Sequence, residues 1–307
     1  MNVQEECASL AYRAGWKVVQ YLPLPVARVL FNCGADVASG WGSSPRMEQL
    51  RRNLARVVGP ENVTRALVRA SMRSYMRYWM EAFRLPALHK DPQLHSRLRS
   101  GVHGLEHFDA SVARGRGVIL ALTHSGNWDM AGSFLVGHYG AFTTVAERLK
   151  PESLFEAFVE FRESLGFNVI AHRPNRNDPA ANDKPFAQLA RVLEDGGVVC
   201  LLAERDLGRT GVTVDFMGQP ANVAAGPAAL AMRTGAALHA VGLWFEADGW
   251  GMSVSPQIPV TDVEETSQCL ADMYAANIRA HPQDWHMLQP QWNDDVAARD
   301  AQKAAEG

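Results

Sequence analysis

The sequence predicts an α/β protein in which helices flank a mostly parallel central sheet, with a helical N-terminal region before it. Apolar residues recur at helical spacing through the first hundred residues. After residue 115, short apolar segments alternate with amphipathic segments of helical length, which is the pattern of a parallel sheet covered on both faces. The short segments are uniformly apolar, as in VVCLLA at 198–203, and this is typical of strands buried on both sides.

The N-terminal region is expected to hold helices that carry much of the positive charge. One helix should end at Gly59-Pro60, and a longer one should run from Asn62 or Thr64 to just before Pro86. Four arginines follow an i, i+4 row on the longer helix and form one stripe: Arg65, Arg69, Arg73 and Arg77. A helix with aromatic residues beside this stripe suits a lipid headgroup boundary, but it can equally pack its apolar face on a core. The excess positive charge is also compatible with a solvated helical face.

The segment 23–41 is apolar and bounded by proline, and only Arg28 and Asp36 interrupt it with charge. It is too short and too charged to span a bilayer, so we expect an amphipathic membrane-docking helix. Further along the chain, strands and helices are expected to alternate. The expected strands are 118–123, 142–146, 167–171, 198–203, 236–245 and 252–258, and the expected helices are 127–138, 152–165, 184–194, 224–234 and 263–280. The polar tail, 293–307, is expected to be frayed.

Composition excludes several classes of protein. Hydrophobic residues make up 47% and charged residues 21% of the chain, so it is not a disordered protein. The four cysteines are scattered without a Cys-x-x-Cys pair, which argues against a zinc ribbon, a redox motif or a disulfide framework and fits reducing surroundings. Neither a signal peptide nor a transmembrane segment is expected.

The charge is distributed unevenly along the chain. Residues 1–100 hold 15 Lys and Arg against 7 Asp and Glu, a net charge of +8, although the whole chain carries −3. A basic region of this kind suits nucleic acid or an anionic membrane surface.

The first candidate catalytic pair is His124 and Asp129. His124 directly follows the first clear strand, and ligand sites in open α/β sheets lie at the carboxyl ends of strands. Asp129 follows in the first turn of the next expected helix, and Gly126 permits a sharp turn between them. A carboxylate at this spacing can orient an imidazole that acts as a general base. The alternative is a helix-capping Asp beside a buried, hydrogen-bonded His.

Two later segments carry candidate binding groups. LLAERDLGRTG at 201–211 crowds Glu204, Arg205 and Asp206 into a turn after another strand. The small residues of 219–235, with Pro227 after Gly226, mark a helix start whose backbone N–H groups could bind an oxyanion or a phosphate. Tight helix–sheet packing explains the small residues equally well.

These segments resemble the lysophospholipid acyltransferase superfamily. HSGNWD (124–129) is similar to its His-x4-Asp block, and Glu204 in LAERD stands at its later Glu block, although the usual Pro-Glu-Gly-Thr-Arg form is absent. The likeness is closest to the bacterial lauroyl/myristoyl-type branch and, within it, to actinobacterial phosphatidylinositol mannoside acyltransferases. Further similar stretches are AERLKP (146–151), FRESLGF (161–167), DFMGQPANVAAGPAALA (215–231) and HPQDWHMLQPQW (281–292). The resemblance covers about residues 10 to 292, although relatives often carry Glu where Asp129 stands.

The resemblance implies transfer of a fatty acyl group from acyl-CoA to a mannose hydroxyl of a phosphatidylinositol mannoside. The enzyme would act peripherally at the cytoplasmic face of the plasma membrane, without a cofactor and without a nucleic-acid partner. The chain would divide into a helical membrane-docking region (1–100), an acyltransferase α/β core (101–292) and a polar tail (293–307). An apolar groove lined by 127–138 and 224–231 is expected to lead to the base.

The implied residue roles follow the chemistry of acyl transfer. His124 would deprotonate the sugar hydroxyl, Asp129 would orient His124, and Glu204 would lie nearest the acceptor sugar. The remaining polar positions of the similar stretches are expected to bind substrate, with Arg148 and Arg205 meeting phosphates; they are Glu147, Arg148, Arg162 and Arg205. Salt bridges that brace the site are the alternative for each of these residues.

Other functions fit the sequence less well. Ser125 adjoins His124 but lacks a Gly-x-Ser-x-Gly elbow. GRGVIL (115–120) lacks the dinucleotide-binding glycine pattern, and no phosphate-binding Gly-x4-Gly-Lys loop occurs. His103 and His107 have no evident third metal ligand. The alternatives that stay open are an acyltransferase for another glycolipid or lysophospholipid, more distantly a thioesterase, and a non-enzymatic basic membrane- or nucleic-acid-binding module.

Overall fold

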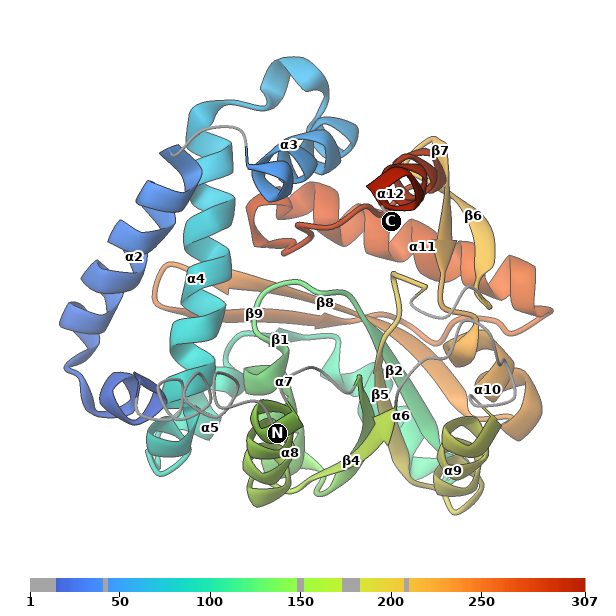
Figure 1. Cartoon of the computed structure of the whole chain (residues 1–307). Helices are drawn as coiled ribbons and strands as arrows, with labels where there is room; N and C mark the ends of the chain where they lie inside the picture. Colours follow the sequence, from blue (N-terminus) through green and yellow to red (C-terminus); the bar gives the residue numbers. More distant parts are fainter. Residues whose placement is uncertain (1–14, 41–43, 148–151, 173–182, 207–209, 307) are drawn as a thin grey trace.

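A mostly parallel sheet forms the centre of the molecule (Figure 1). The computed structural model describes residues 15–40, 44–147, 152–172, 183–206 and 210–306. Seven strands lie in the order β1-β9-β8-β2-β5-β3-β4, and only β8 and β9 pair in antiparallel fashion. Their bounds are β1 Val102–His103, β2 Val118–Leu122, β3 Phe142–Glu147, β4 Phe167–His172, β5 Val198–Leu202, β8 Ala237–Glu246 and β9 Gly249–Val254. The predicted α/β fold class is confirmed.

Helices cover both faces of this sheet, so alternate residues of each central strand pack into two different cores. On β2, Ile119 and Ala121 pack into one core, whereas Leu120 and Leu122 pack into the other. The first core includes residues of α9 (Asp183–Glu194), α10 (Gly226–Thr234) and α11 (Val263–Ala280). The second includes residues of α5 (Leu94–Arg99), α6 (Leu105–Ala113), α7 (Trp128–His138) and α8 (Glu152–Ser164). Uniformly apolar strands therefore reflect burial on both sides.

The N-terminal helices form a smaller core beside the sheet. Their bounds are α2 Leu24–Gly40, α3 Pro45–Val58, η1 Pro60–Asn62 and α4 Arg65–Leu88. Leu50 and Leu54 of α3 pack there with Val68 and Met72 of α4, and α2 runs alongside α4 (Figure 1). α4 continues past Pro86, where we had expected it to end. Pro86 lies in the last turn, so its missing N–H removes a hydrogen bond only near the end of the helix.

The arginine stripe of α4 is largely engaged in contacts within the protein. Arg69 and Arg73 both hydrogen-bond the Asp36 carboxylate of α2, and these guanidinium groups hold the pKa of that carboxyl well below its usual range. Arg77 pairs with Glu81 and donates to the carbonyl oxygens of Glu246 and Gly249. The stripe therefore fastens α4 to α2 and to the sheet.

The outer face of α2 is apolar and exposed, so this helix is amphipathic, as the sequence predicts. The large exposed apolar side chains of α2 are Leu24, Val26, Val29, Leu30 and Val37, and Val18 and Tyr21 precede them. Among the described residues, no helix is both long and apolar enough to cross a membrane.

The structure contains a hairpin that the sequence did not predict. A hairpin of β6 (Val212–Phe216) and β7 (Gln219–Val223) lies apart from the main sheet. Its two-residue turn places Met217 at φ +59° and Gly218 at φ +88°, as a type I′ turn requires. Met-Gly is not the usual Asn-Gly signal for that turn, so the hairpin escaped sequence analysis.

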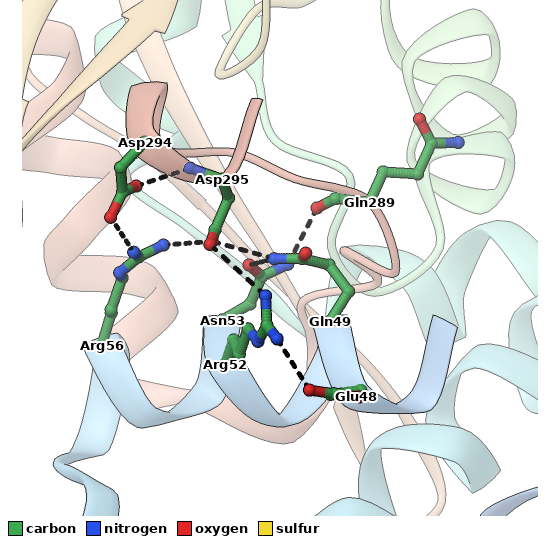
Figure 2. A network of polar contacts seen from close by, with 8 residues as sticks. All are labelled: Glu48, Gln49, Arg52, Asn53, Arg56, Gln289, Asp294 and Asp295. Carbon is green, nitrogen blue, oxygen red and sulfur yellow. Dashed lines mark hydrogen bonds and ion pairs between the residues drawn. The ribbon is translucent and has the colours of Figure 1, made fainter. Parts of the chain in front are cut away.

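The C-terminal segment is helical rather than frayed: α12 spans Asn293–Glu306. Figure 2 shows how its first turn is held by α3. Arg56 pairs with Asp294 at 2.6 Å and also with Asp295, and Gln49 donates to Asp295 at 3.0 Å. These tertiary contacts offset the fraying that a polar terminal sequence would otherwise show.

Candidate active site

The turn after β2 positions His124 at the carboxyl end of the sheet. Gly126 takes φ +54°, and a Cβ atom there would lie 2.8 Å from the backbone nitrogen of Trp244. Only glycine fits such a turn. Asn127 then caps α7 by accepting a hydrogen bond from the Met130 N–H. The chain thus reverses within a few residues, which leaves the His124 side chain at the mouth of the turn.

Glu204 holds the imidazole of His124. Its Oε1 atom lies 2.8 Å from His124 Nδ1 and also accepts a hydrogen bond from the backbone N–H of His124 at 2.7 Å. The His124 side chain is 39% exposed, whereas that of Glu204 is fully buried. A carboxylate at Nδ1 selects the tautomer whose Nε2 carries a lone pair. A histidine held in this way can act as a general base.

The charge of Glu204 is maintained by its partner. Burial alone would raise the pKa of Glu204, but attraction to His124 and the hydrogen bonds from His124 outweigh burial and lower the pKa. An ionised carboxylate beneath the imidazole stabilises the imidazolium that forms when the base takes a proton. We had expected Glu204 to lie nearest the acceptor sugar. The structure shows its carboxylate completely buried and in contact with His124, which suits a residue that positions the imidazole ring.

Asp129 is buried in a second polar cluster beside the turn. Arg162 Nε donates to Asp129 Oδ1 at 2.9 Å, and the Tyr78 hydroxyl donates to Oδ2 at 3.1 Å. The Arg162 guanidinium also lies 4.1 Å from the centre of the Trp128 ring. Burial alone would lower the pKa of Arg162, but Asp129 and Tyr78 raise it above its usual value. Sequence spacing suggested that Asp129 orients His124, but these contacts instead join Asp129 to α4 and α8.

The loop at 281–287 packs against the turn at residues 123–127, which carries the proposed base and is called the catalytic turn below. The sequence did not indicate that this loop belongs to the site. The His286 N–H donates to the His124 carbonyl oxygen at 2.8 Å, and the Gly126 N–H donates to the Asp284 carbonyl oxygen at 2.9 Å. Burial, and then the nearby His124, lower the pKa of His286 to about 3, so this ring is neutral. Ser74 Oγ lies 2.9 Å from its Nε2 and donates to Asp284 Oδ1 at 2.7 Å. The stretch 281–292 was a sequence signal for this loop, although it pointed to no particular role.

Glu81 of α4 hydrogen-bonds to the same turn. Its Oε2 atom accepts hydrogen bonds from Asn127 Nδ2 at 2.8 Å and from the Trp250 indole at 2.7 Å, while Arg77 binds Oε1 at 2.8 Å. A buried carboxylate needs such compensation. The N-terminal helices therefore support the catalytic turn directly.

The remaining candidate residues lie near the strand ends or outside the described residues. Arg205 follows Glu204 and is half-buried. Glu147 is the last residue of β3, but its side chain lies outside the described part of the chain, as does Arg148. Within the described ranges, no group of three or more His, Cys, Asp and Glu side chains is arranged to hold a metal ion.

An apolar cavity lies directly behind the turn. Its volume is about 60 Å³. Two of its lining residues, Leu122 and Trp128, lie just before and just after His124 in the sequence. Ala131, Phe134 and Leu135 line it from α7, and β2, β5, β8, β9 and α6 supply the rest of an apolar wall. Residues 224–231 do not contribute to this wall, contrary to expectation. Most of these residues belong to α10, which packs against α9 and α11 on the opposite face of the sheet.

A partly exposed histidine held by a buried carboxylate therefore lies beside an apolar cavity at the carboxyl end of a parallel sheet. The chain belongs to the bacterial lipid A biosynthesis acyltransferase family, which matches residues 3–294, and it is an acyltransferase. It is 51% identical over 302 residues to the phosphatidylinositol mannoside acyltransferase of Mycolicibacterium smegmatis, covering 95% of this chain and 93% of that protein. The phosphatidylinositol mannoside acyltransferase of Mycobacterium tuberculosis is 49% identical over 304 residues, covering 96% and 92%. The family resemblance inferred from the sequence is confirmed.

Proposed function

We propose that the protein transfers a long-chain acyl group from acyl-CoA to a mannose hydroxyl of a phosphatidylinositol mannoside. Two relatives that carry this activity in their names match nearly the whole chain at about half identity. The observation that carries the chemical proposal is the His124–Glu204 pair, because it leaves Nε2 of an accessible imidazole unprotonated at the end of the sheet.

In the proposed reaction, His124 Nε2 removes the proton of the acceptor hydroxyl while its oxygen attacks the thioester carbonyl carbon. The tetrahedral intermediate collapses by breaking the carbon–sulfur bond. Protonated His124 then returns its proton to the departing CoA thiolate, so the base is regenerated. Glu204 keeps the ring in place and offsets its transient positive charge. A covalent acyl-enzyme is unnecessary because the thioester is already activated.

The apolar cavity behind the turn is the proposed entry point for the acyl chain. Burial of a methylene group contributes about 0.8 kcal/mol, so an apolar wall beside the base both binds the chain and aligns the thioester. Asp129 remains part of the proposed machinery because it fixes Arg162 against Trp128, a residue that also lines the cavity. Glu147, Arg148 and Arg205 are proposed to bind substrate at the neighbouring strand ends.

The acceptor is a membrane lipid, so the enzyme is proposed to act peripherally at the cytoplasmic face of the plasma membrane. The exposed apolar face of α2 supports this proposal, since such a face can enter the headgroup region. The engaged arginines of α4 contribute less to docking than the sequence suggested. Arg28 and Arg65 remain exposed on α2 and α4 and are proposed to meet the anionic surface.

The test is direct. Purified protein is incubated with long-chain acyl-CoA and a panel of acceptors, and the lipids are analysed by mass spectrometry. The panel holds phosphatidylinositol mannosides, other glycolipids and lysophospholipids. Acylation on a mannose supports the proposal. Preferential acylation of a lysophospholipid or another glycolipid, or hydrolysis of acyl-CoA without transfer, would replace it.

A further inference from the structure

A second and more polar cavity opens between α2, α4 and the turn that joins β8 to β9. Its volume is about 450 Å³, within the size range of small-molecule sites. α2 and α4 stand side by side at the left of Figure 1, with the end of the β8–β9 hairpin beside them. The polar residues that line the cavity are Arg28, Asn32, Arg73, Ser74, Arg77 and Gln283, with Glu246 and Asp284.

The wall formed by α2 and α4 carries excess positive charge. Arg28 makes no hydrogen bond or ion pair with the residues that the structure describes, and its side chain is exposed at the cavity. Arg73 binds the Asp36 carboxylate through Nε and Nη2, and Arg69 binds the same carboxylate, so one of the two positive charges is unbalanced and Arg73 can reach a ligand only through Nη1. Arg77 is balanced by Glu81. Arg28 and Arg73 are therefore available to an anionic group such as a phosphate.

The cavity also offers groups that suit hydroxyls. Asn32 and Gln283 supply amides that both donate and accept, and Glu246 supplies a carboxylate at the rim. Two acidic side chains, Glu246 and Asp284, would oppose a ligand with several negative charges. A single phosphodiester attached to a hydroxylated ring fits this mixture of groups better.

The position of the cavity identifies the source of such a ligand. Arg28 lies on the same helix as the exposed apolar residues Val26, Val29 and Leu30. If that face enters the bilayer, the cavity opens at the depth where phospholipid headgroups lie. On the inner side, Ser74 joins the cavity wall to His286, whose backbone holds the His124 turn. The site is thus separate from the apolar cavity but close to the catalytic loop.

We propose that this cavity binds the phosphate-bearing polyol headgroup of a membrane phospholipid, with Arg28 and Arg73 on the phosphate and Asn32 and Gln283 on hydroxyls. The proposal rests on the membrane location of α2 proposed above. The headgroup belongs either to the acceptor itself or to a neighbouring phosphatidylinositol, and both present the same phosphoinositol chemistry. A bound headgroup would fix the orientation of the enzyme on the bilayer and brace the loop behind His124.

The first test measures binding of soluble glycerophosphoinositol by calorimetry, without acyl donor or turnover. Arg28→Gln should weaken binding about tenfold, as expected for a lost charge-assisted hydrogen bond. Ala247→Trp fills the cavity from the exposed β8–β9 turn and should abolish binding without a change of charge. Arg191→Gln removes the same charge from exposed α9, on the other side of the molecule, and should bind as wild type does.

The second test separates the cavity from the membrane surface. Val29→Ser with Leu30→Ser should reduce flotation with vesicles of phosphatidylcholine and phosphatidylinositol but leave glycerophosphoinositol binding intact. Mannosylated headgroups that bind more tightly than glycerophosphoinositol would assign the cavity to the acceptor; equal binding would assign it to phosphatidylinositol.

Three results would overturn the inference: equal losses in Arg28→Gln and Arg191→Gln, unchanged binding in Ala247→Trp, or inorganic phosphate binding as tightly as glycerophosphoinositol. Because binding is measured without turnover, failure of the proposed acyl transfer would leave these readouts unaffected. Circular dichroism and thermal unfolding confirm that each variant is folded.

Discussion

At the catalytic turn, a single carboxylate oxygen accepts two hydrogen bonds from the same residue. Glu204 Oε1 binds both the backbone N–H and the Nδ1 atom of His124, so the ring is fixed relative to its own backbone. The imidazole ring therefore has little rotational freedom left to lose when substrate binds. This arrangement also keeps a partly exposed histidine in one orientation, as the proposed general base requires.

Replacement of His124 by Ala should lower acyl transfer by about 10²–10⁴-fold, because the proposed general base is lost. The side chain is exposed by more than a third, so the fold should survive. Initial rates with acyl-CoA and a mannoside acceptor measure the effect, and thermal unfolding serves as the control. Turnover close to that of wild type would remove His124 from the mechanism.

Glu204→Gln should lower transfer by about 10²-fold or more, because tautomer control is weakened and the imidazolium loses its counter-charge. Without the negative charge, His124 should lose its proton more readily, so the acidic limb of the pH–rate profile should move to lower pH. A purely structural role for Glu204 would lower the rate at every pH without moving that limb.

The lowered pKa of Glu204 also has a consequence for stability. The contribution of its ionised form to folding is present above the usual value of 4.5 and is lost as the pH falls through the lowered value. The difference in unfolding free energy between wild type and Glu204→Gln should therefore shrink in acid. Urea unfolding at several pH values measures it.

Asp129→Asn should be destabilising as well as inactivating, because it leaves the buried Arg162 guanidinium without its ionised partner. Breaking a buried pair costs about 3–5 kcal/mol, whereas replacing both members with apolar residues is often nearly neutral. Arg162→Met in the Asp129→Leu background should therefore recover part of the lost unfolding free energy without restoring transfer. Equal unfolding midpoints for Asp129→Asn and wild type would contradict the structural part of this role.

At the scale of elements, α7 links the base to the apolar cavity. It starts in the turn that holds His124, and its Ala131 lies in the cavity wall. The same helix therefore positions both the proposed base and the cavity beside it. A change in its apolar face should alter the preference for acyl-chain length and leave the position of His124 unchanged.

Ala131→Phe should shift the preference toward shorter acyl-CoA, because the added ring occupies space that the chain requires. Each methylene excluded from the apolar wall should cost about fourfold in kcat/KM, equivalent to about 0.8 kcal/mol. The measurement compares a series of acyl-CoA lengths. The matched control is Ala110→Phe on the exposed face of α6, outside the wall. An unchanged length preference in Ala131→Phe would separate this cavity from acyl binding.

At the scale of the whole molecule, helix α3 of the N-terminal region contacts the start of the C-terminal helix α12 (Figure 1). Arg56 of α3 binds both Asp294 and Asp295 at the start of α12 (Figure 2), and its guanidinium lies 4.8 Å from the centre of the Trp292 ring. The segment that leads into α12 includes Asp284 and His286, whose backbone groups hydrogen-bond to the catalytic turn. The N-terminal helices and the C-terminal segment therefore jointly hold the site from outside the sheet.

Arg56→Met should lower the unfolding free energy by about 1–3 kcal/mol, because Asp295 is nearly buried and loses a charged partner. Arg52→Met removes an arginine of the same helix that pairs with Glu48 and reaches Asp295 only at 4.0 Å; because its side chain is 53% exposed, the change should cost no more than about 0.5 kcal/mol. Urea unfolding of both variants gives the comparison. Similar values for the two variants would mean that the contact with α12 contributes little.

The sequence by itself determined the class of fold, because burial on both faces leaves uniformly apolar strands between amphipathic helices. It also placed His124 correctly at the end of β2. Chain order could not show which carboxylate reaches the imidazole. Asp129 is close in sequence, yet α7 carries it into a cluster with Tyr78 and Arg162.

Tertiary structure decided the pairing of His124 with Glu204. β2 and β5 are neighbours in the sheet although β3 and β4 lie between them in the chain. Their parallel register pairs Leu122 with Leu202, so the residue two positions beyond each strand end comes to the same place. Only the order and register of the strands bring Glu204 beneath His124, because residues 80 positions apart are joined by sheet hydrogen bonds and not by any local pattern.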